Sequence, residues 1–93
     1  MTSVRVSLKE DVIIVNELGL HARSAAKLAK AAKKASGRVW LEKGGESVDA
    51  KQVIDLLTLA AARGDRVCVA VERPADAGIL SSIVALIESG FGE

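Results

Sequence analysis

The spacing of apolar positions changes several times along the chain, which is typical of a domain that mixes strands with helices. Residues 12–15 (VIIV) predict a strand, and the alternation of Val4, Val6 and Leu8 is a possible extension of it. The Glu10-Asp11 pair lies between the two stretches and is a candidate interruption of that alternation. The N-terminal region therefore predicts one strand whose beginning is left open.

The strongest helical pattern lies in the second part of the stretch NELGLHARSAAKLAKAAKKASG. At about 100° per residue, basic and apolar side chains separate onto opposite faces of one helix. The basic stripe consists of Arg23, Lys27, Lys30 and Lys34. The apolar face consists of Ala25, Leu28, Ala32 and Ala35. Gly37 stands where such a helix commonly ends.

Short alternating segments make up the rest of the chain. Residues 43–46 (KGGE) predict a turn between two strands, and Gly64 and Gly90 end predicted helices. In order, we expect a strand at 38–42, a strand at 47–49, a helix at 50–63, a strand at 67–71 and a helix with apolar positions 79, 80, 83, 84 and 87. The order βαββαβα predicts an α+β fold, in which an antiparallel or mixed sheet carries its helices on one face.

Length and composition exclude several classes of function. The 93 residues suffice for one domain, 1–93, and 49% of them are hydrophobic, so a core of small aliphatic side chains is expected. A net charge of +1 gives no case for nucleic acid. One histidine and one cysteine, Cys68, argue against a metal site or an internal disulfide, and we expect no cofactor. No apolar stretch is long enough for a signal peptide or a bilayer span, so we expect a cytoplasmic protein without membrane insertion.

One histidine carries the candidate chemistry. His21 stands where a glycine-containing loop meets the first turn of the predicted helix. Backbone N–H groups lack partners there, and the helix dipole disfavours a positive charge, so an imidazole tends to remain neutral and nucleophilic. A phosphoryl group on it would meet free donors and Arg23. A lone histidine at a helix start is more often a cap or a solvated residue, so both interpretations stay open on these grounds.

Three stretches of the sequence carry a resemblance: LGLHARSAAKLA, ESVDAKQVIDLLTLAAARGD and the ending ALIESGFGE. Together they resemble the histidine-containing phosphocarrier family (HPr) of the bacterial phosphotransferase system, including its nitrogen-related branch. The resemblance covers about residues 9–93, and its first stretch is the most specific because it matches the active-site pattern G-[LIM]-H-A-R-P-A. It implies an open-faced β-sandwich, with a four-stranded antiparallel sheet and three helices on one face.

The resemblance also implies a reaction cycle. Enzyme I, charged by phosphoenolpyruvate, would phosphorylate His21 at Nδ1, and Arg23 would stabilise the phosphate. A sugar-specific or regulatory acceptor domain would then receive the phosphoryl group, so the chain would be a relay and not a stand-alone catalyst. Partners would dock on positions that match Val53, Ile54 and Leu57, although some of these must belong to the core. We expect a monomer.

Two positions depart from the family's pattern. Ser24 stands where the family usually has proline, and its hydroxyl would cap the helix or contact the phosphate, unless it is simply a tolerated substitution. Gln52 occupies the position of the family's regulatory serine. Because glutamine cannot be phosphorylated, we expect no switching at that position.

The basic stripe adds a hypothesis about partners. Such a stripe is usually a solvated helix face, but here it runs directly from His21 and would steer acidic partners to it. Two rival functions remain: an HPr-like regulatory module that binds proteins without relaying phosphate, and a small-molecule-binding α+β domain. His21 and Arg23 argue against the first, whereas Ser24 and Gln52 leave it open. The second lacks any ligand motif.

Overall fold

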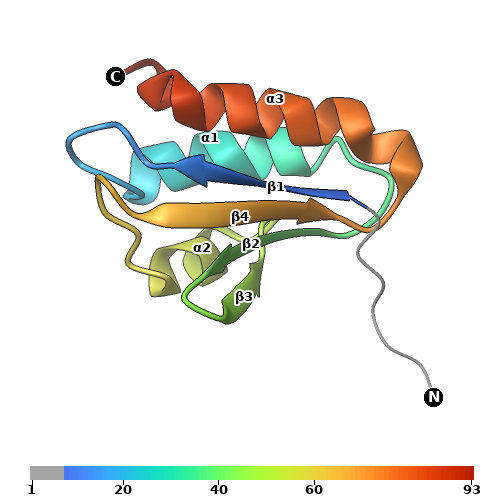
Figure 1. The fold of residues 1–93 in the computed structure, drawn as a ribbon, viewed down its shortest axis with the longest axis horizontal. Coiled ribbons are helices and arrows are strands. Elements are labelled where there is room, and N and C mark those ends of the chain that lie inside the picture. The colour runs from blue at the N-terminus through green and yellow to red at the C-terminus, as the bar shows by residue number, and fades with distance from the viewer. Residues whose placement is uncertain (1–7) are drawn as a thin grey trace.

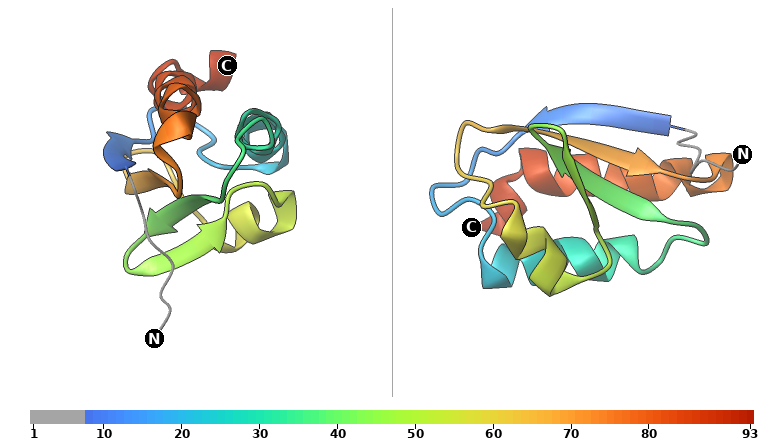
Figure 2. Two further views of the ribbon diagram at one scale, coloured as in Figure 1. Left: turned by 90° about the vertical axis from the view of Figure 1, so that its right-hand side faces the viewer. Right: turned by 90° about the horizontal axis from the view of Figure 1, so that it is seen from below.

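The computed structural model describes residues 8–93, so the predicted strand positions Val4 and Val6 lie outside the described residues. Its sheet has four antiparallel strands in the order β1-β4-β2-β3, and three helices cover one face (Figure 1 and Figure 2). The predicted α+β open-faced sandwich is thereby confirmed. The elements are β1 (Leu8–Ile13), α1 (Ala22–Ala32), β2 (Val39–Lys43), β3 (Glu46–Asp49), α2 (Val53–Thr58), β4 (Arg66–Val71) and α3 (Ala77–Glu88), with short 3-10 turns at Pro74–Asp76 and Gly90–Gly92.

Strand β1 begins and ends earlier than the apolar run at 12–15 predicts. Glu10 and Asp11 do not interrupt it, because both pair with β4 in the antiparallel register. Their exposed side chains are tolerated since β1 is an edge strand of the sheet. Beyond the strand, Ile14 still exchanges two backbone hydrogen bonds with residues 64 and 65. The chain therefore leaves the sheet gradually on its way to α1.

Helix α2 is much shorter than the predicted helix at 50–63, which is wrong at both ends. The Ala50 N–H donates to a β2 carbonyl at 2.9 Å, so this residue completes the β2–β3 hairpin instead of starting a helix. Ala60 adopts a left-handed φ of 49°, which does not continue a right-handed helix. Leu59 and Ala61 are nevertheless only 4% exposed. The buried residues of the loop after α2 thus continue the apolar spacing that is typical of a helix, although they are not helical.

The core lies between the inner face of the sheet and the helices. The predicted apolar face of α1 is buried, with Ala25, Leu28 and Ala32 fully enclosed. It packs with sheet and helix residues that include Val12, Val39, Leu41, Val67, Val69, Val71, Leu56, Leu80, Ile83 and Ile87. Strand alternation places Trp40 and Cys68 on the opposite, outer face, which no helix of residues 8–93 covers. Within that part of the chain, no helix combines the length and the apolar character needed to cross a bilayer.

Asp76 joins the start of α3 to the loop after α1. This buried carboxylate accepts the backbone N–H groups of Ser36 at 2.9 Å and Gly37 at 2.8 Å, and the Ser36 hydroxyl at 3.1 Å. These hydrogen bonds hold the pKa of Asp76 below its usual value of 3.8. The ionised form is therefore the one that stabilises the fold.

Replacing Asp76 by asparagine is expected to lower the free energy of unfolding at pH 7. The asparagine side chain has an NH₂ group in place of one carboxylate oxygen. This group cannot accept a hydrogen bond from the N–H donors of residues 36 and 37, so at least one hydrogen bond is lost. Because the folded pKa is depressed, the contribution of the carboxylate is present above pH 3.8 and disappears as the pH falls through the lower folded value. Urea unfolding from pH 7 to pH 2 should show parent and variant converging in acid. Glu46→Gln, at an exposed carboxylate, is the control; a difference that is constant with pH would contradict the assignment.

Candidate functional site

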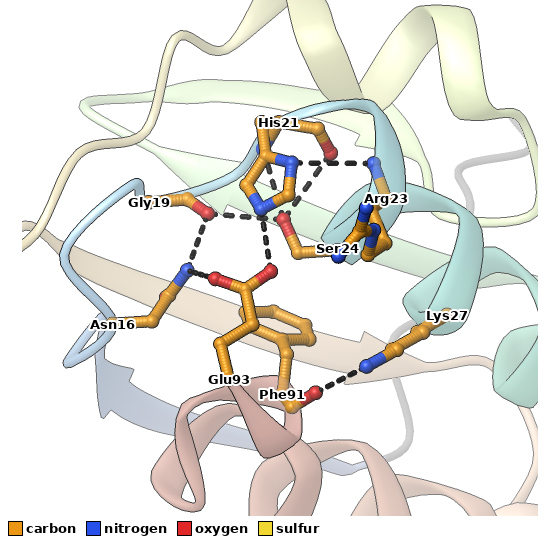
Figure 3. A network of polar contacts seen from close by, with 8 residues as sticks. All are labelled: Asn16, Gly19, His21, Arg23, Ser24, Lys27, Phe91 and Glu93. Atoms are coloured by element: carbon orange, nitrogen blue, oxygen red, sulfur yellow. Dashed lines mark hydrogen bonds and ion pairs between the residues drawn. The ribbon is translucent and has the colours of Figure 1, made fainter.

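His21 is the N-cap of α1, at the end of the β1–α1 loop (Figure 3). Its backbone is extended, with φ −116° and ψ −177°, so the chain turns into the helix immediately after it. Its Nδ1 atom accepts the backbone N–H of Arg23 at 3.3 Å. The side chain is 29% exposed. The ring therefore lies at the surface, beside the first helical turn, with its Nδ1 edge toward the backbone N–H of Arg23.

The buried side chain of Ser24 stabilises the start of α1. Its hydroxyl accepts the His21 N–H at 2.9 Å and donates to the Gly19 carbonyl at 2.9 Å. The bonds between His21 and the first turn run in both directions and form a capping box. Because Ser24 is fully buried, its hydroxyl serves the loop backbone.

Gly19 and Asn16 shape the loop that presents the histidine. Gly19 has a φ of 65°, and a Cβ atom there would lie 2.6 Å from the Ala61 carbonyl oxygen. The next residue, Leu20, donates its N–H to the same oxygen at 2.9 Å. Asn16 Nδ2 donates to the Gly19 carbonyl at 2.7 Å. The loop is thus held against the segment after α2, and only glycine fits at the closest approach.

Glu93 lies beside the ring although 72 positions separate it from His21 in the sequence. Its Oε2 atom is 2.5 Å from His21 Nε2, and its Oε1 accepts Asn16 Nδ2 at 3.0 Å. The hydrogen bond from Asn16, followed by that of His21 and the charge of Lys27, holds the pKa of Glu93 below its usual range. A carboxylate anion therefore faces one edge of the imidazole while the backbone N–H of Arg23 faces the other (Figure 3).

The segment that carries Glu93 is fixed by its own contacts. Phe91 is 1% exposed and adopts a left-handed φ of 59°. Lys27 Nζ donates to the Phe91 carbonyl at 2.6 Å, so this residue of the basic stripe also anchors the end of the chain that the structure describes. Sequence reasoning missed Asn16 and Glu93, because no local pattern links them to the histidine. Glu93 belongs to the ending ALIESGFGE, which supports the family resemblance but does not indicate a contact with His21.

A surface hollow of about 560 Å³ opens beside the ring. It is lined by Leu18, His21, Ala22, Arg23, Lys27, Gly92 and Glu93. The first turn of α1 contains no acidic residue. The helix dipole at the start of α1 and the Arg23 side chain therefore favour an anion on the Nδ1 side of the histidine, whereas the Glu93 carboxylate lies on the Nε2 side.

The remaining polar candidates lie further from the ring. Lys30 and Lys34 are exposed on α1, in line with Arg23 and Lys27. Gln52 is the exposed N-cap of α2, and its side chain makes no capping hydrogen bond. No group of three or more metal-binding side chains occurs among residues 8–93.

The apolar candidates on α2 divide into exposed and packed residues. Ile54 is 73% exposed, whereas Val53 and Leu57 are partly buried and pack against the core. Leu18, which sequence reasoning missed, is 71% exposed and lines the hollow. Leu18 and Ile54 are the most exposed large hydrophobic side chains of the described residues, so they are the apolar groups best placed to contact another protein.

Comparisons with known proteins agree on one family. Residues 8–89 match the model of the PTS HPr component phosphorylation site. The phosphocarrier protein HPr of Cupriavidus necator is 37% identical over 86 residues, covering 92% of this chain and 97% of the relative. The phosphocarrier protein NPr of Escherichia coli K12 is 36% identical over 89 residues, covering 95% and 99%. A crystal structure of HPr from Thermoanaerobacter tengcongensis superimposes with a TM-score of 0.87 at 35% identity, covering 92% of this chain and 97% of the other.

Proposed function

Since the chain belongs to the HPr family of phosphotransferase-system phosphocarriers, we propose that His21 is the residue that receives and donates the phosphoryl group. His21 is the only histidine of the sequence. The observation that carries the assignment is the position of its ring, which caps α1 and borders a hollow suited to an anion. This one place would serve both the resting ring and the phosphorylated ring.

The reaction is a phosphoryl transfer between two protein nucleophiles. The lone pair of Nδ1 attacks the phosphorus atom, the bond from phosphorus to the donor breaks, and its electron pair remains on the donor. The phosphoryl oxygens would then lie near the first N–H groups of α1 and the Arg23 guanidinium. In the second half of the cycle the N–P bond breaks, and the electron pair returns to Nδ1. The chain supplies position and charge, so it is a relay that acts only with its partners.

The family implies partners of the phosphotransferase system such as enzyme I. We propose that enzyme I, charged by phosphoenolpyruvate, is the donor and that the acceptor is a sugar-specific or regulatory domain. We further propose a cytoplasmic monomer that docks through the surface around Leu18, Ile54 and the basic stripe. Gln52 at the start of α2 offers no hydroxyl to a serine kinase.

Incubation with phosphoenolpyruvate and enzyme I tests the function directly. The intact mass is expected to increase by one phosphoryl group, and the gain should disappear in acid because phosphoramidates hydrolyse there. Coupling between ³¹P and ¹⁵N should place the phosphorus on Nδ1 of His21. An acid-stable gain, a phosphoryl group on a hydroxyl, or no gain at all would contradict the proposal.

Reversing charges on the basic stripe is expected to slow phosphoryl transfer from enzyme I. Lys27→Glu with Lys30→Glu should reduce the second-order rate constant roughly tenfold at low ionic strength, because steering acts on association. The dependence of the rate on salt should weaken in the same variant. Stopped or quenched-flow transfer assays over a range of salt concentrations measure both effects.

Two further variants separate steering from local damage. Lys30→Glu with Lys34→Glu leaves the Lys27 contact to Phe91 intact and should still slow transfer. Lys9→Glu with Lys33→Glu makes the same change in net charge off the stripe and should leave the rate near that of the parent. Equal rates for all three variants at low salt would refute steering.

Replacing Ser24 by proline separates two roles of this residue. Ser24→Ala removes the acceptor of the His21 N–H and should lower the free energy of unfolding by about 1 kcal/mol. Proline loses the same bond but restricts the unfolded chain, so Ser24→Pro should recover part of that loss. Because the hydroxyl is buried in the loop, we expect both variants to exchange phosphate with enzyme I and with the acceptor at the parent's rates. Rates that differ would mean that Ser24 contacts the phosphoryl group.

A further inference from the structure

We propose that Lys43 and Asp65 form a clamp that positions His21 for phosphoryl transfer, although neither side chain bonds to the β1–α1 loop. The clamp acts through residues 59–62, which follow α2 and contact that loop. The inference deepens the proposed function, because it rests on His21 being the phosphoryl carrier. It gives a role to two charged residues that the active-site motif does not contain.

Lys43, the last residue of β2, holds the end of α2 through its ammonium group. Its Nζ donates to the Leu59 carbonyl at 3.2 Å and to the Ala60 carbonyl at 3.3 Å, and it lies 3.2 Å from Asp65 Oδ2. An ammonium group has three hydrogens, so these acceptors use all of its donors. Carbonyls at a helix C-terminus lack partners within the helix and favour a cation. No other lysine or arginine among residues 8–93 forms an ion pair with a carboxylate.

The clamp stabilises a turn that is unfavourable by itself. Ala60 has a left-handed φ of 49°, which a residue with a Cβ atom rarely adopts, and Lys43 bonds the carbonyls at and before it. Asp65 Oδ2 accepts the Ala62 N–H at 2.9 Å. This hydrogen bond, followed by that of Lys43, holds the pKa of Asp65 below its usual value of 3.8. The segment is therefore held on both sides of Ala61.

Ala61 connects the clamp to the histidine. Its carbonyl accepts the N–H of Leu20, the residue before His21, at 2.9 Å. The Asp65 carbonyl accepts the N–H of Ile14, the first residue of the β1–α1 loop, at 2.9 Å. Figure 1 shows the loop after α2 beside the β1–α1 loop at one end of the sheet. Both ends of the histidine-bearing loop are thus tied to the segment that the clamp holds.

The position of the ring is what the clamp contributes to the reaction. In-line transfer requires Nδ1 to approach phosphorus along one direction, and a displacement of about 1 Å can slow such a step by as much as about 100-fold. Without the clamp, the Ala61 carbonyl is free to shift, and the Leu20 N–H shifts with it. His21 follows directly in the chain, so its ring moves relative to the first turn of α1. Neither charge of the clamp has to reach the phosphoryl group for this effect.

Replacing Lys43 by methionine removes the ammonium group and keeps a long unbranched side chain. Transfer from saturating enzyme I should slow about tenfold, with KM little changed, because the ring is displaced and not the docking surface. Lys51→Met is the matched control. Lys51 Nζ donates to the Ala35 carbonyl at 3.2 Å, beyond the opposite end of α1 from His21. The control therefore loses the same charge and the same kind of contact, and its rate should stay near that of the parent.

Hydrogen exchange at the Leu20 amide separates positioning from a general loss of stability. This N–H is bonded to the Ala61 carbonyl, so Lys43→Met should increase its exchange rate more than it increases exchange of the amides in β4. The NMR signals of the His21 ring should shift in the same variant. Lys51→Met should leave both the Leu20 exchange and the ring signals as in the parent.

A milder variant tests whether the two residues act as one unit. Asp65→Asn keeps an oxygen for the Ala62 N–H but loses the charge that attracts Lys43. It should slow transfer less than Lys43→Met does. The double variant should be little slower than Lys43→Met alone, because the substitutions break one shared contact.

The outcomes distinguish this inference from the function on which it rests. Equal transfer rates for Lys43→Met and Lys51→Met would overturn it. Slower transfer with parent-like Leu20 exchange and parent-like His21 signals would overturn it as well, because the lysine would then act on the partner and not on the loop. If the parent itself took up no phosphate, the proposed function would fail, while the Leu20 exchange would still show whether the clamp holds the loop.

Discussion

A chain in which asparagine replaces His21 is expected to fold normally and to take up no phosphoryl group. Asparagine is among the best N-cap residues, so it can accept the N–H groups at the start of α1 in place of the ring. It has no nucleophilic nitrogen, and the sequence contains no second histidine. Phosphorylation by phosphoenolpyruvate and enzyme I, followed by intact mass, should therefore fall to background, while the thermal unfolding midpoint stays near that of the parent.

A second variant controls for the cap itself. His21→Ala should lose the phosphoryl group as completely, but it should also lose about 0.5–2 kcal/mol of unfolding free energy because the cap is gone. The difference between the two variants separates folding from chemistry. Acid-labile phosphate on either variant would show that another residue is the acceptor.

Alanine at position 19 is expected to damage both stability and phosphoryl transfer. The left-handed φ alone costs roughly 1–2 kcal/mol for a residue with a Cβ. The new Cβ would also lie 2.6 Å from the Ala61 carbonyl oxygen and 2.9 Å from the Ala62 Cα, which are backbone atoms that cannot move aside. The loop must shift, so the Leu20–Ala61 hydrogen bond and the position of His21 change together.

Gly44→Ala is a matched control for this substitution. Gly44 has a similar φ of 59°, but no atom lies within 4 Å of its would-be Cβ. Chemical unfolding should show that Gly19→Ala loses about 1–3 kcal/mol more than Gly44→Ala, which is the cost of overpacking. Transfer from enzyme I should slow markedly only in the Gly19 variant. Equal losses in both variants would mean that the close approach at residue 61 does not hold the loop.

The part of the site that can be predicted from the sequence is formed by residues that lie close to one another along the chain. The helix after residue 21, its basic stripe and its apolar face all follow from residues within a few turns of one another, and the structure contains them. His21 and Arg23 are two residues apart, so the backbone of one helix start brings them together. The spacing of residues along the chain was therefore sufficient to predict most of the structure on the Nδ1 side of the ring.

The other half depends on contacts that no spacing reveals. Asn16 and Glu93 meet because α3 returns alongside β1 and ends beside the β1–α1 loop. The length of α2 was mispredicted for a related reason. Ala60 adopts a left-handed backbone just before Ala61, whose carbonyl accepts a hydrogen bond from Leu20 in the histidine loop, and that contact exists only in the folded chain. Neither the contact between Asn16 and Glu93 nor the left-handed backbone of Ala60 can be inferred from helical propensity or periodicity.

The outer face of the sheet, which no helix of residues 8–93 covers, determines how this protein can be followed by fluorescence. Strand alternation places Trp40, the only tryptophan, on that face, so its indole lies on the side of the sheet opposite the helices. Its fluorescence emission should change when the β2–β3 hairpin unfolds. It should stay constant when His21 is phosphorylated or dephosphorylated. A partner that quenched it would have to be touching the side of the molecule that the relay does not use.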